Sequence, residues 1–163
     1  MILVISDTHD NEKLTRKLVD KYKSRDVEAL IHCGDVVDFK LFELLNRITD
    51  NIYLVRGNND KYSEETVAEL SSAGVLYSIP PFSFVIEGYG NFVIMHEPYF
   101  IEEYINRKNV DFILYGHTHN AKFYEKNGKK ILNPGALSYF LNPIPYYAAI
   151  SRDSSIMLHK DIK

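Results

Sequence analysis

Short apolar runs typical of strands alternate with helical patterns through the first half of the sequence, and this alternation restricts the fold more than any other feature. Residues 2–6 are apolar and rich in β-branched side chains, as expected for a strand buried on both faces. Strand character returns at residues 27–32 and in the segment that ends at Gly57. Because strands joined by helical crossovers run parallel, this order predicts parallel βαβ units.

Three amphipathic stretches supply the helices of this pattern. Apolar residues recur every three or four positions over 14–22 and 41–48, with charged residues between them. Asp38 is a candidate N-cap for the second helix. Ser63, followed by two glutamates, predicts the start of a third helix, and Gly74 predicts its end.

The second half of the sequence is richer in strands. Its predicted elements are two strands around a Gly-rich turn (82–96), a short helix (100–108), a strand (111–116), a hairpin turning at Asn127-Gly128 (122–133) and a hairpin turning near Asp153 (146–160). No Pro-, Gly- or Ser-rich linker separates the halves. We therefore expect residues 1–163 to form one domain of two packed β-sheets with helices outside.

Five polar clusters each follow a predicted strand. Ligands of open α/β sheets bind at the carboxyl ends of the strands, and we therefore expect the clusters to face one crevice. They are Asp7-Thr8-His9, the segment 34–38, the segment 57–60, His96, and the segment 116–119.

The side chains in these clusters are metal ligands by type, because carboxylate and imidazole together suit Zn, Mn, Fe or Ni. Seven candidates exceed the capacity of one ion, and a carboxylate shared between two ions accommodates the count. Histidines two residues apart lie on one face if the strand continues, unless the loop splays them. The candidates are Asp7, His9, Asp35, Asn58, His96, His117 and His119.

Each cluster also has an interpretation without a ligand. A single Asp-x-His pattern is common, Asn and Asp favour turns at 58–60, and His96 alone is typical of a hydrogen-bonded core histidine. The occurrence of all five clusters at strand ends makes coincidence a poor explanation.

The motifs SDTHDN, IHCGDVVD, RGNND, MHE, YGHTH and NPGALS resemble, in order and spacing, those of the calcineurin-like metallophosphoesterase superfamily. Within it, the chain is similar to small phosphodiesterases of the YfcE type, including archaeal members. The resemblance runs from residue 2 to about residue 138. It implies an α/β fold, a four-layer α/β/β/α sandwich of two mixed β-sheets flanked by helices.

The resemblance also implies a division of the ligands between two metal ions. Asp7, His9 and His119 correspond to ligands of one ion, and Asn58, His96 and His117 to ligands of the other, with Asp35 bridging them. The implied reaction is hydrolysis of phosphodiester or phosphomonoester bonds by in-line attack of a metal-bridging hydroxide. Manganese or nickel is expected, with zinc, iron or cobalt as alternatives.

Three positions depart from the family pattern. Asn59 stands where many members have a histidine that protonates the leaving group; it is a catalytic candidate, beside Asp35 and Asn58, that donates hydrogen bonds but no proton. Asp10 replaces a glycine, and we expect it to cap the following helix. Glu97 also replaces a glycine, and binding metal, orienting a ligand, repelling an anionic substrate and lying solvated in a loop all remain open. The turn at 133–135 is expected to be buried and to support the metal loops.

Two other functions compete with hydrolysis of a small phosphoester. One is a non-catalytic Vps29-like protein-interaction scaffold on the same fold, and the other is a nuclease acting on DNA ends. A net charge of −3 offers no basic field for nucleic acid, so we expect no such partner. The single cysteine, Cys33, and the absence of a run of ~20 apolar residues predict a cytoplasmic protein without a membrane partner. Aromatic residues between 140 and 147 suit either a core or an interface between copies, which leaves a homo-oligomer open.

Overall fold

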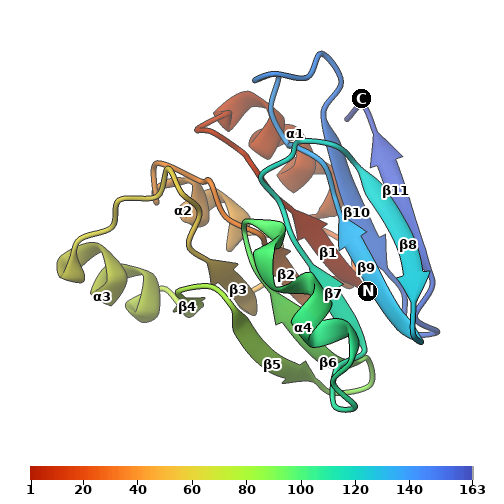
Figure 1. Cartoon of the computed structure of the whole chain (residues 1–163). Helices are drawn as coiled ribbons and strands as arrows, with labels where there is room; N and C mark the ends of the chain where they lie inside the picture. Colours follow the sequence, from red (N-terminus) through yellow and green to blue (C-terminus); the bar gives the residue numbers. More distant parts are fainter. Residues whose placement is uncertain (163) are drawn as a thin grey trace.

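The computed structural model describes residues 1–162, and its first sheet has six strands (Figure 1). Strands β1 to β4 run parallel, β10 pairs with β1 in antiparallel orientation, and β11 pairs with β10 in the same way. In spatial order the strands are β11 (Ile156–Lys160), β10 (Tyr146–Ile150), β1 (Ile2–Ile5), β2 (Ala29–His32), β3 (Ile52–Val55) and β4 (Val75–Ser78).

The second sheet has five strands and is also mixed. Its β6–β7 and β7–β9 pairs are parallel, whereas β5–β6 and β8–β9 are antiparallel. In spatial order the strands are β5 (Phe82–Ile86), β6 (Gly90–Ile94), β7 (Phe112–Leu114), β9 (Lys129–Asn133) and β8 (Lys122–Lys126). Asn127 and Gly128 both have positive φ, which confirms the predicted tight hairpin turn.

Helices cover the outer faces of both sheets. Figure 1 shows α1 and α4 on opposite outer sides of the pair of sheets. Leu18 and Phe42 pack on the first sheet, and Ile105 packs on the second. The helices are α1 (Glu12–Tyr22), α2 (Leu41–Leu45), α3 (Glu64–Ser72) and α4 (Ile101–Ile105), the last preceded by the 3₁₀ turn η1 (Pro98–Phe100). A third core, which includes Val4 and Phe112, lies between the two sheets. The predicted four-layer sandwich is therefore confirmed.

Several local predictions need correction. Strand β4 was not predicted, because residues 75–78 follow directly on the C-terminal end of α3 at Gly74. Helices α2 and α4 are shorter than their apolar patterns. Asp38 accepts a hydrogen bond from the backbone N–H of Lys40 in the turn before α2, and Lys40 occupies the N-cap position instead. The N-cap of α1 is Asn11 rather than Asp10, since the Asn11 side chain accepts from the N–H of Leu14.

The predicted starts and ends of other elements are confirmed. Ser63 caps α3 by accepting from the N–H of Thr66, and Gly74 follows the helix with φ of 80°.

Across residues 1–162, no helix has both the length and the apolar character needed to cross a membrane.

Backbone hydrogen bonds join the loops at the carboxyl ends of the strands. The N–H of Asp7 donates to the carbonyl of Gly34, at 3.0 Å, and the N–H of Gly116 donates to the carbonyl of His96, at 3.0 Å. The N–H of His117 then donates to Oδ2 of Asp7, at 3.1 Å, which ties the two sheets together at this end. The N–H of Asp35 donates to Oδ2 of Asp60, at 3.0 Å, so the five polar clusters meet in one place.

Candidate metal centre

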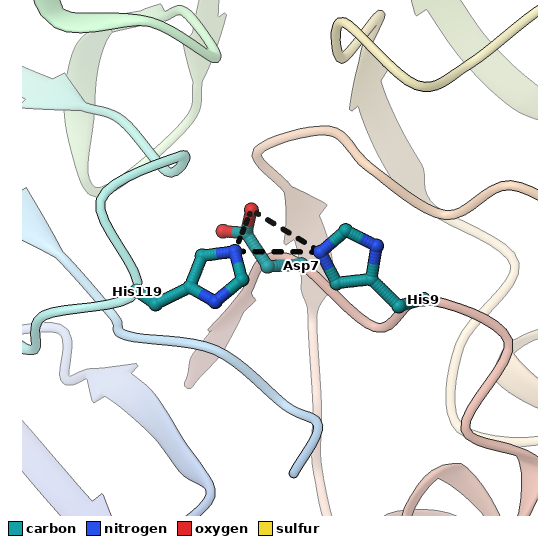
Figure 2. Close-up of side chains that lie close together, drawn as sticks. All are labelled: Asp7, His9 and His119. Atoms are coloured by element: carbon teal, nitrogen blue, oxygen red, sulfur yellow. Dashed lines mark hydrogen bonds and ion pairs between the residues drawn. The ribbon is translucent and has the colours of Figure 1, made fainter. Parts of the chain in front are cut away.

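Three of the predicted ligands form a compact group (Figure 2). Nε2 of His119 lies 3.2 Å from Oδ1 of Asp7, and Nε2 of His9 lies 4.0 Å from the same oxygen. The two imidazole nitrogens are 3.3 Å apart. Asp7 is fully buried and His119 nearly so, and the three donor atoms point toward a common space (Figure 2).

The hydrogen bonds around this group leave it short of a positive charge. Nδ1 of His119 donates to the carbonyl of Phe140, at 3.0 Å, so a neutral ring presents the lone pair of Nε2 to Asp7. Oδ1 of Asp7 is buried and meets no hydrogen-bond donor. The carboxylate of Asp7 raises the pKa of His119, so a proton on Nε2 competes with a metal ion for this place. A divalent cation would interact at once with Oδ1 of Asp7 and with the Nε2 lone pair of neutral His119, so the donor set fits a metal ion.

A second group adjoins the first. Oδ1 of Asn58 lies 2.8 Å from Nε2 of His96 and 3.0 Å from Nδ1 of His117. His96 is buried, and its Nδ1 donates to the carbonyl of Cys33, at 2.8 Å, so Nε2 faces the site. A backbone acceptor behind a histidine is the usual way of orienting a metal-binding imidazole.

Asp35 lies between the two groups. Its Oδ2 is 3.8 Å from Nε2 of His9 and 3.4 Å from Nε2 of His96. Burial opposes ionisation of Asp35, but hydrogen bonds from His96 and Asn59 outweigh it and hold the pKa of the carboxyl well below its usual range. Burial alone would lower the pKa of His96, and the carboxylates of Asp35 and Asp7 raise it instead. Asp35 is therefore a buried anion with a histidine from each group beside it.

The backbone at the site differs from a continued strand. Strand β1 ends at Ile5, and both Asp7 and His9 have left-handed φ, of 52° and 42°. His117 and His119 are also left-handed, with φ of 64° and 56°. The loop thus splays the two histidines: His119 joins Asp7, and His117 joins Asn58. Such strained backbone is typical of functional sites.

Asp60 organises the loop that carries Asp35. Its two carboxylate oxygens accept four backbone N–H bonds, from Asp35, Val36, Val37 and Gly57, at distances of 2.7 to 3.0 Å. Asp60 is buried. Asp60 is therefore the acceptor for two loops at once, its own and the loop that carries Asp35.

Asn133 supports the loop that carries the two histidines. Its Nδ2 donates to the carbonyl of Gly116, at 2.8 Å, and to the hydroxyl of Thr118, at 2.9 Å. Its Oδ1 accepts from the N–H of Gly135, at 2.8 Å. The predicted buried, supporting turn at 133–135 is confirmed.

His32 links the loop after β1 to the loop after β2 through two hydrogen bonds. The N–H of Gly34 donates to its Nδ1, at 3.1 Å, so Nε2 carries the proton and donates to the hydroxyl of Thr8, at 3.2 Å. Burial lowers the pKa of His32 to about 4, and the ring is therefore neutral at pH 7.

Two positions at the site must be glycine because neighbouring atoms lie too close to leave room for a β-carbon. A β-carbon at Gly57 would collide with the backbone and carboxylate of Asp35, and one at Gly116 would collide with Ser6 and Asp7. Neither position tolerates a side chain unless a ligand loop moves.

The three positions that depart from the family pattern have distinct surroundings. Asn59 donates from its backbone N–H to Oδ1 of Asp35, at 2.9 Å, and from its side-chain amide to Oδ2, at 2.6 Å. Asp10 accepts from the N–H of Asp38, so the expected helix cap is wrong. Glu97 accepts from the hydroxyl of Tyr99, at 3.0 Å, and lies outside both groups of histidines and acids found among residues 1–162.

Two known phosphodiesterases are similar to this chain over most of its length. Phosphodiesterase MJ0936 from Methanocaldococcus jannaschii is 29% identical over 146 residues, which are 87% of this chain and 87% of that protein. The solved structure of a novel archaeal phosphodiesterase has 27% identity and a TM-score of 0.89, with 98% of this chain and 99% of that chain covered.

A second type of relative is named for a different role. Vacuolar protein sorting-associated protein 29 from Schizosaccharomyces pombe is 26% identical over 164 aligned positions, which cover 96% of this chain and 80% of that protein. The family model of the calcineurin-like phosphoesterase superfamily domain matches residues 1–154. With this match over nearly its whole length, the chain belongs to the calcineurin-like phosphoesterase superfamily.

Proposed function

We propose that this protein is a metal-dependent phosphodiesterase. The names of the archaeal relatives, both phosphodiesterases, support this activity. The observation that carries the proposal is the buried Oδ1 of Asp7, which lacks a hydrogen-bond donor while two histidine nitrogens point toward it. A structural cluster would pair such an oxygen with a donor, whereas a metal site leaves it free.

The donor set divides between two ions in this proposal. Asp7, His9 and His119 would hold one, Asn58, His96 and His117 the other, and Asp35 would contact both. Manganese or nickel is preferred, with zinc, iron or cobalt as alternatives, because mixed carboxylate, amide and imidazole ligands accept several ions. When bound, two such ions activate water at neutral pH and neutralise phosphate charge.

The protein's own residues contribute orientation more than proton transfer. Hydrogen bonds to the carbonyls of Phe140 and Cys33 direct Nε2 of His119 and of His96 into the site. Asn59 holds both oxygens of Asp35 and offers no proton to a departing alkoxide. The proposed substrates are therefore esters with good leaving groups, such as aryl or nucleotide diesters.

Hydrolysis of bis(4-nitrophenyl) phosphate tests the proposal. Wild-type protein should release nitrophenolate with Mn²⁺ or Ni²⁺ and lose this activity with a chelator, and Asp35→Asn should reduce the rate at least about 100-fold. Equal rates for the two proteins, or no hydrolysis with any of five metals, would reject it. A parallel series with 4-nitrophenyl phosphate measures the preference for diesters over monoesters.

A non-catalytic scaffold is the second candidate, and the similarity to vacuolar protein sorting-associated protein 29 favours it. Metal analysis separates the two functions. A phosphodiesterase should retain close to two equivalents of divalent metal after dialysis, whereas a scaffold should bind metal weakly and show no hydrolysis.

A further inference from the structure

The loop that follows the turn at 133–135 exposes an unusual run of apolar side chains beside the candidate metal centre. Phe140 is 56% exposed and Leu141 is 82% exposed. Leu141 also has a left-handed backbone, with φ of 60°. An exposed leucine in a strained conformation is costly to stability, and residues of this kind cluster at functional sites.

This loop is anchored to the metal centre through His119. The carbonyl of Phe140 accepts from Nδ1 of His119, at 3.0 Å, and the side chain of Asn142 donates to the carbonyl of His119, at 3.3 Å. Bonds on both sides of Leu141 thus fix the loop against one ligand. The backbone of Phe140 is held in place by the same hydrogen bond that orients His119.

The ring of Phe140 lies next to two of the predicted ligands. Its centroid is 4.9 Å from that of His9 and 5.9 Å from that of His119. More than half of the residue remains open to solvent. A phosphate bound to the metal ion that these histidines would hold would therefore lie close to an exposed aromatic surface.

Tyr139, the aromatic residue next to Phe140 in the sequence, has different surroundings. Tyr139 is 53% exposed, but it lines a shallow pocket with Pro143, Ile144 and Lys160 and has no ring contact with either histidine. Phe140 is thus distinguished from Tyr139 by position, although the two have similar size and exposure.

We infer that Phe140 is a specificity-determining residue, which stacks on an aryl or nucleobase group of the substrate next to the metal ion held by Asp7, His9 and His119. This inference rests on the proposed function and names the substrate class of that site. Stacking on an aromatic side chain tolerates different bases, because every base presents a π-face.

The first test measures binding without turnover. Calorimetry compares phenylphosphonate with methylphosphonate on the Mn²⁺-loaded protein, because the two ligands share the phosphonate and differ in the aryl group. Wild type should bind phenylphosphonate about 10-fold more tightly. Phe140→Ala should lose this preference and keep the affinity for methylphosphonate, whereas Phe140→Tyr and the matched control Tyr139→Ala should retain both.

The second test compares a diester that carries aromatic groups with one that carries none. The kcat/KM of Phe140→Ala should fall about 10-fold for bis(4-nitrophenyl) phosphate and stay near wild type for bis(2,2,2-trifluoroethyl) phosphate, whose hydrolysis is followed by fluorine NMR. Phe140→Leu, which keeps the bulk of the side chain, should show the same selective loss.

The outcomes separate this inference from the proposed function. If Phe140→Ala weakens both phosphonates equally, or Tyr139→Ala has the same effect, the ring only braces the loop and the inference is wrong while hydrolysis stands. Binding of neither phosphonate, together with no hydrolysis of either diester, would overturn the proposed function and the inference with it.

Discussion

Nε2 of His9 and Nε2 of His119 lie 3.3 Å apart, although 110 positions separate the two residues in the sequence (Figure 2). Both nitrogens face the same buried carboxylate oxygen of Asp7. Nδ1 of His119 donates to the carbonyl of Phe140, so neutral His119 turns the lone pair of Nε2 toward this anion. A metal ion bound between these atoms would interact with the anion and the lone pair together, and metal binding should therefore stabilise the fold.

Metal ions should raise the melting temperature through this site. With Mn²⁺ at about 100 times its dissociation constant, binding contributes about 2.7 kcal/mol to the free energy of unfolding, or about 5–10 °C in a chain of this size. Calorimetric melts with Mn²⁺ and with a chelator provide the measurement.

Asp7→Asn is the informative variant for this prediction. It removes a buried charge, so its melting temperature in chelator should equal or exceed that of wild type. It also removes a ligand, so the shift with Mn²⁺ should largely disappear. A full shift in the variant would mean that the ion binds elsewhere.

Asp60 should be essential to the geometry of the Asp35 loop. In Asp60→Asn, an amide group replaces an oxygen that accepts two backbone N–H bonds, which leaves those donors unpaired in a buried place. The free energy of unfolding should fall by roughly 2–4 kcal/mol, measured by urea denaturation, and metal affinity should fall about 10- to 100-fold.

The control for this prediction is Asp20→Asn. Asp20 pairs with Lys23 at the exposed C-terminal end of α1, where solvent screens the ion pair and it adds little to stability. Similar destabilisation by the two substitutions would show that Asp60 has no special role.

Asn59 should act by positioning Asp35. Asn59→Ala removes the side-chain donor to Oδ2 and keeps the backbone donor to Oδ1, so Asp35 loses one of two constraints. The kcat/KM for bis(4-nitrophenyl) phosphate should fall about 10-fold. Replacement of Asn106, an exposed asparagine at the end of α4, should change nothing, and a similar loss there would contradict the prediction.

Glu28 should make stability depend on pH at the opposite end of the sheets. Hydrogen bonds from Tyr89, the terminal amine of Met1 and Arg152 lower the pKa of Glu28 from 4.5 to about 2. Since the folded pKa is below the unfolded one, the stabilisation is present above about pH 4.5 and is lost as the pH falls toward 2.

Glu28→Gln isolates this contribution. Measured without metal, the variant should be less stable than wild type at pH 7, and the difference should shrink as the pH falls from about 4.5 toward 2. A difference that stays constant over this window would show that Glu28 is not the titrating group.

The sequence predicts the layers of this fold because its signals are local. Apolar runs such as residues 2–6 and the Asn127-Gly128 turn specify strands and a hairpin from neighbouring residues alone. Strand β4 escaped prediction because Val75 follows Gly74 at once and its burial depends on pairing with β3. Helix α4 is shorter than predicted because its buried residues end at Ile105, and residues 106–108 are exposed.

The sequence predicts those features of the site that depend on neighbouring residues and misses those that depend on distant ones. The candidate ligands could be identified because each follows a strand, and the structure brings all seven into one connected cluster. The splaying of His117 from His119 depends on left-handed backbone, which no residue type in that loop signals. The contact between Phe140 and His9 joins loops at opposite ends of the chain, and nothing in the local sequence indicates it.

Anomalous diffraction from Mn²⁺-loaded crystals measures the proposed two-ion site most directly. Wild type should show two peaks, one beside Asp7, His9 and His119 and the other beside Asn58, His96 and His117, with Asp35 between them. His119→Ala should empty the first peak before the second, and His117→Ala the second before the first. A single peak in wild type, or loss of the same peak in both variants, would contradict the account.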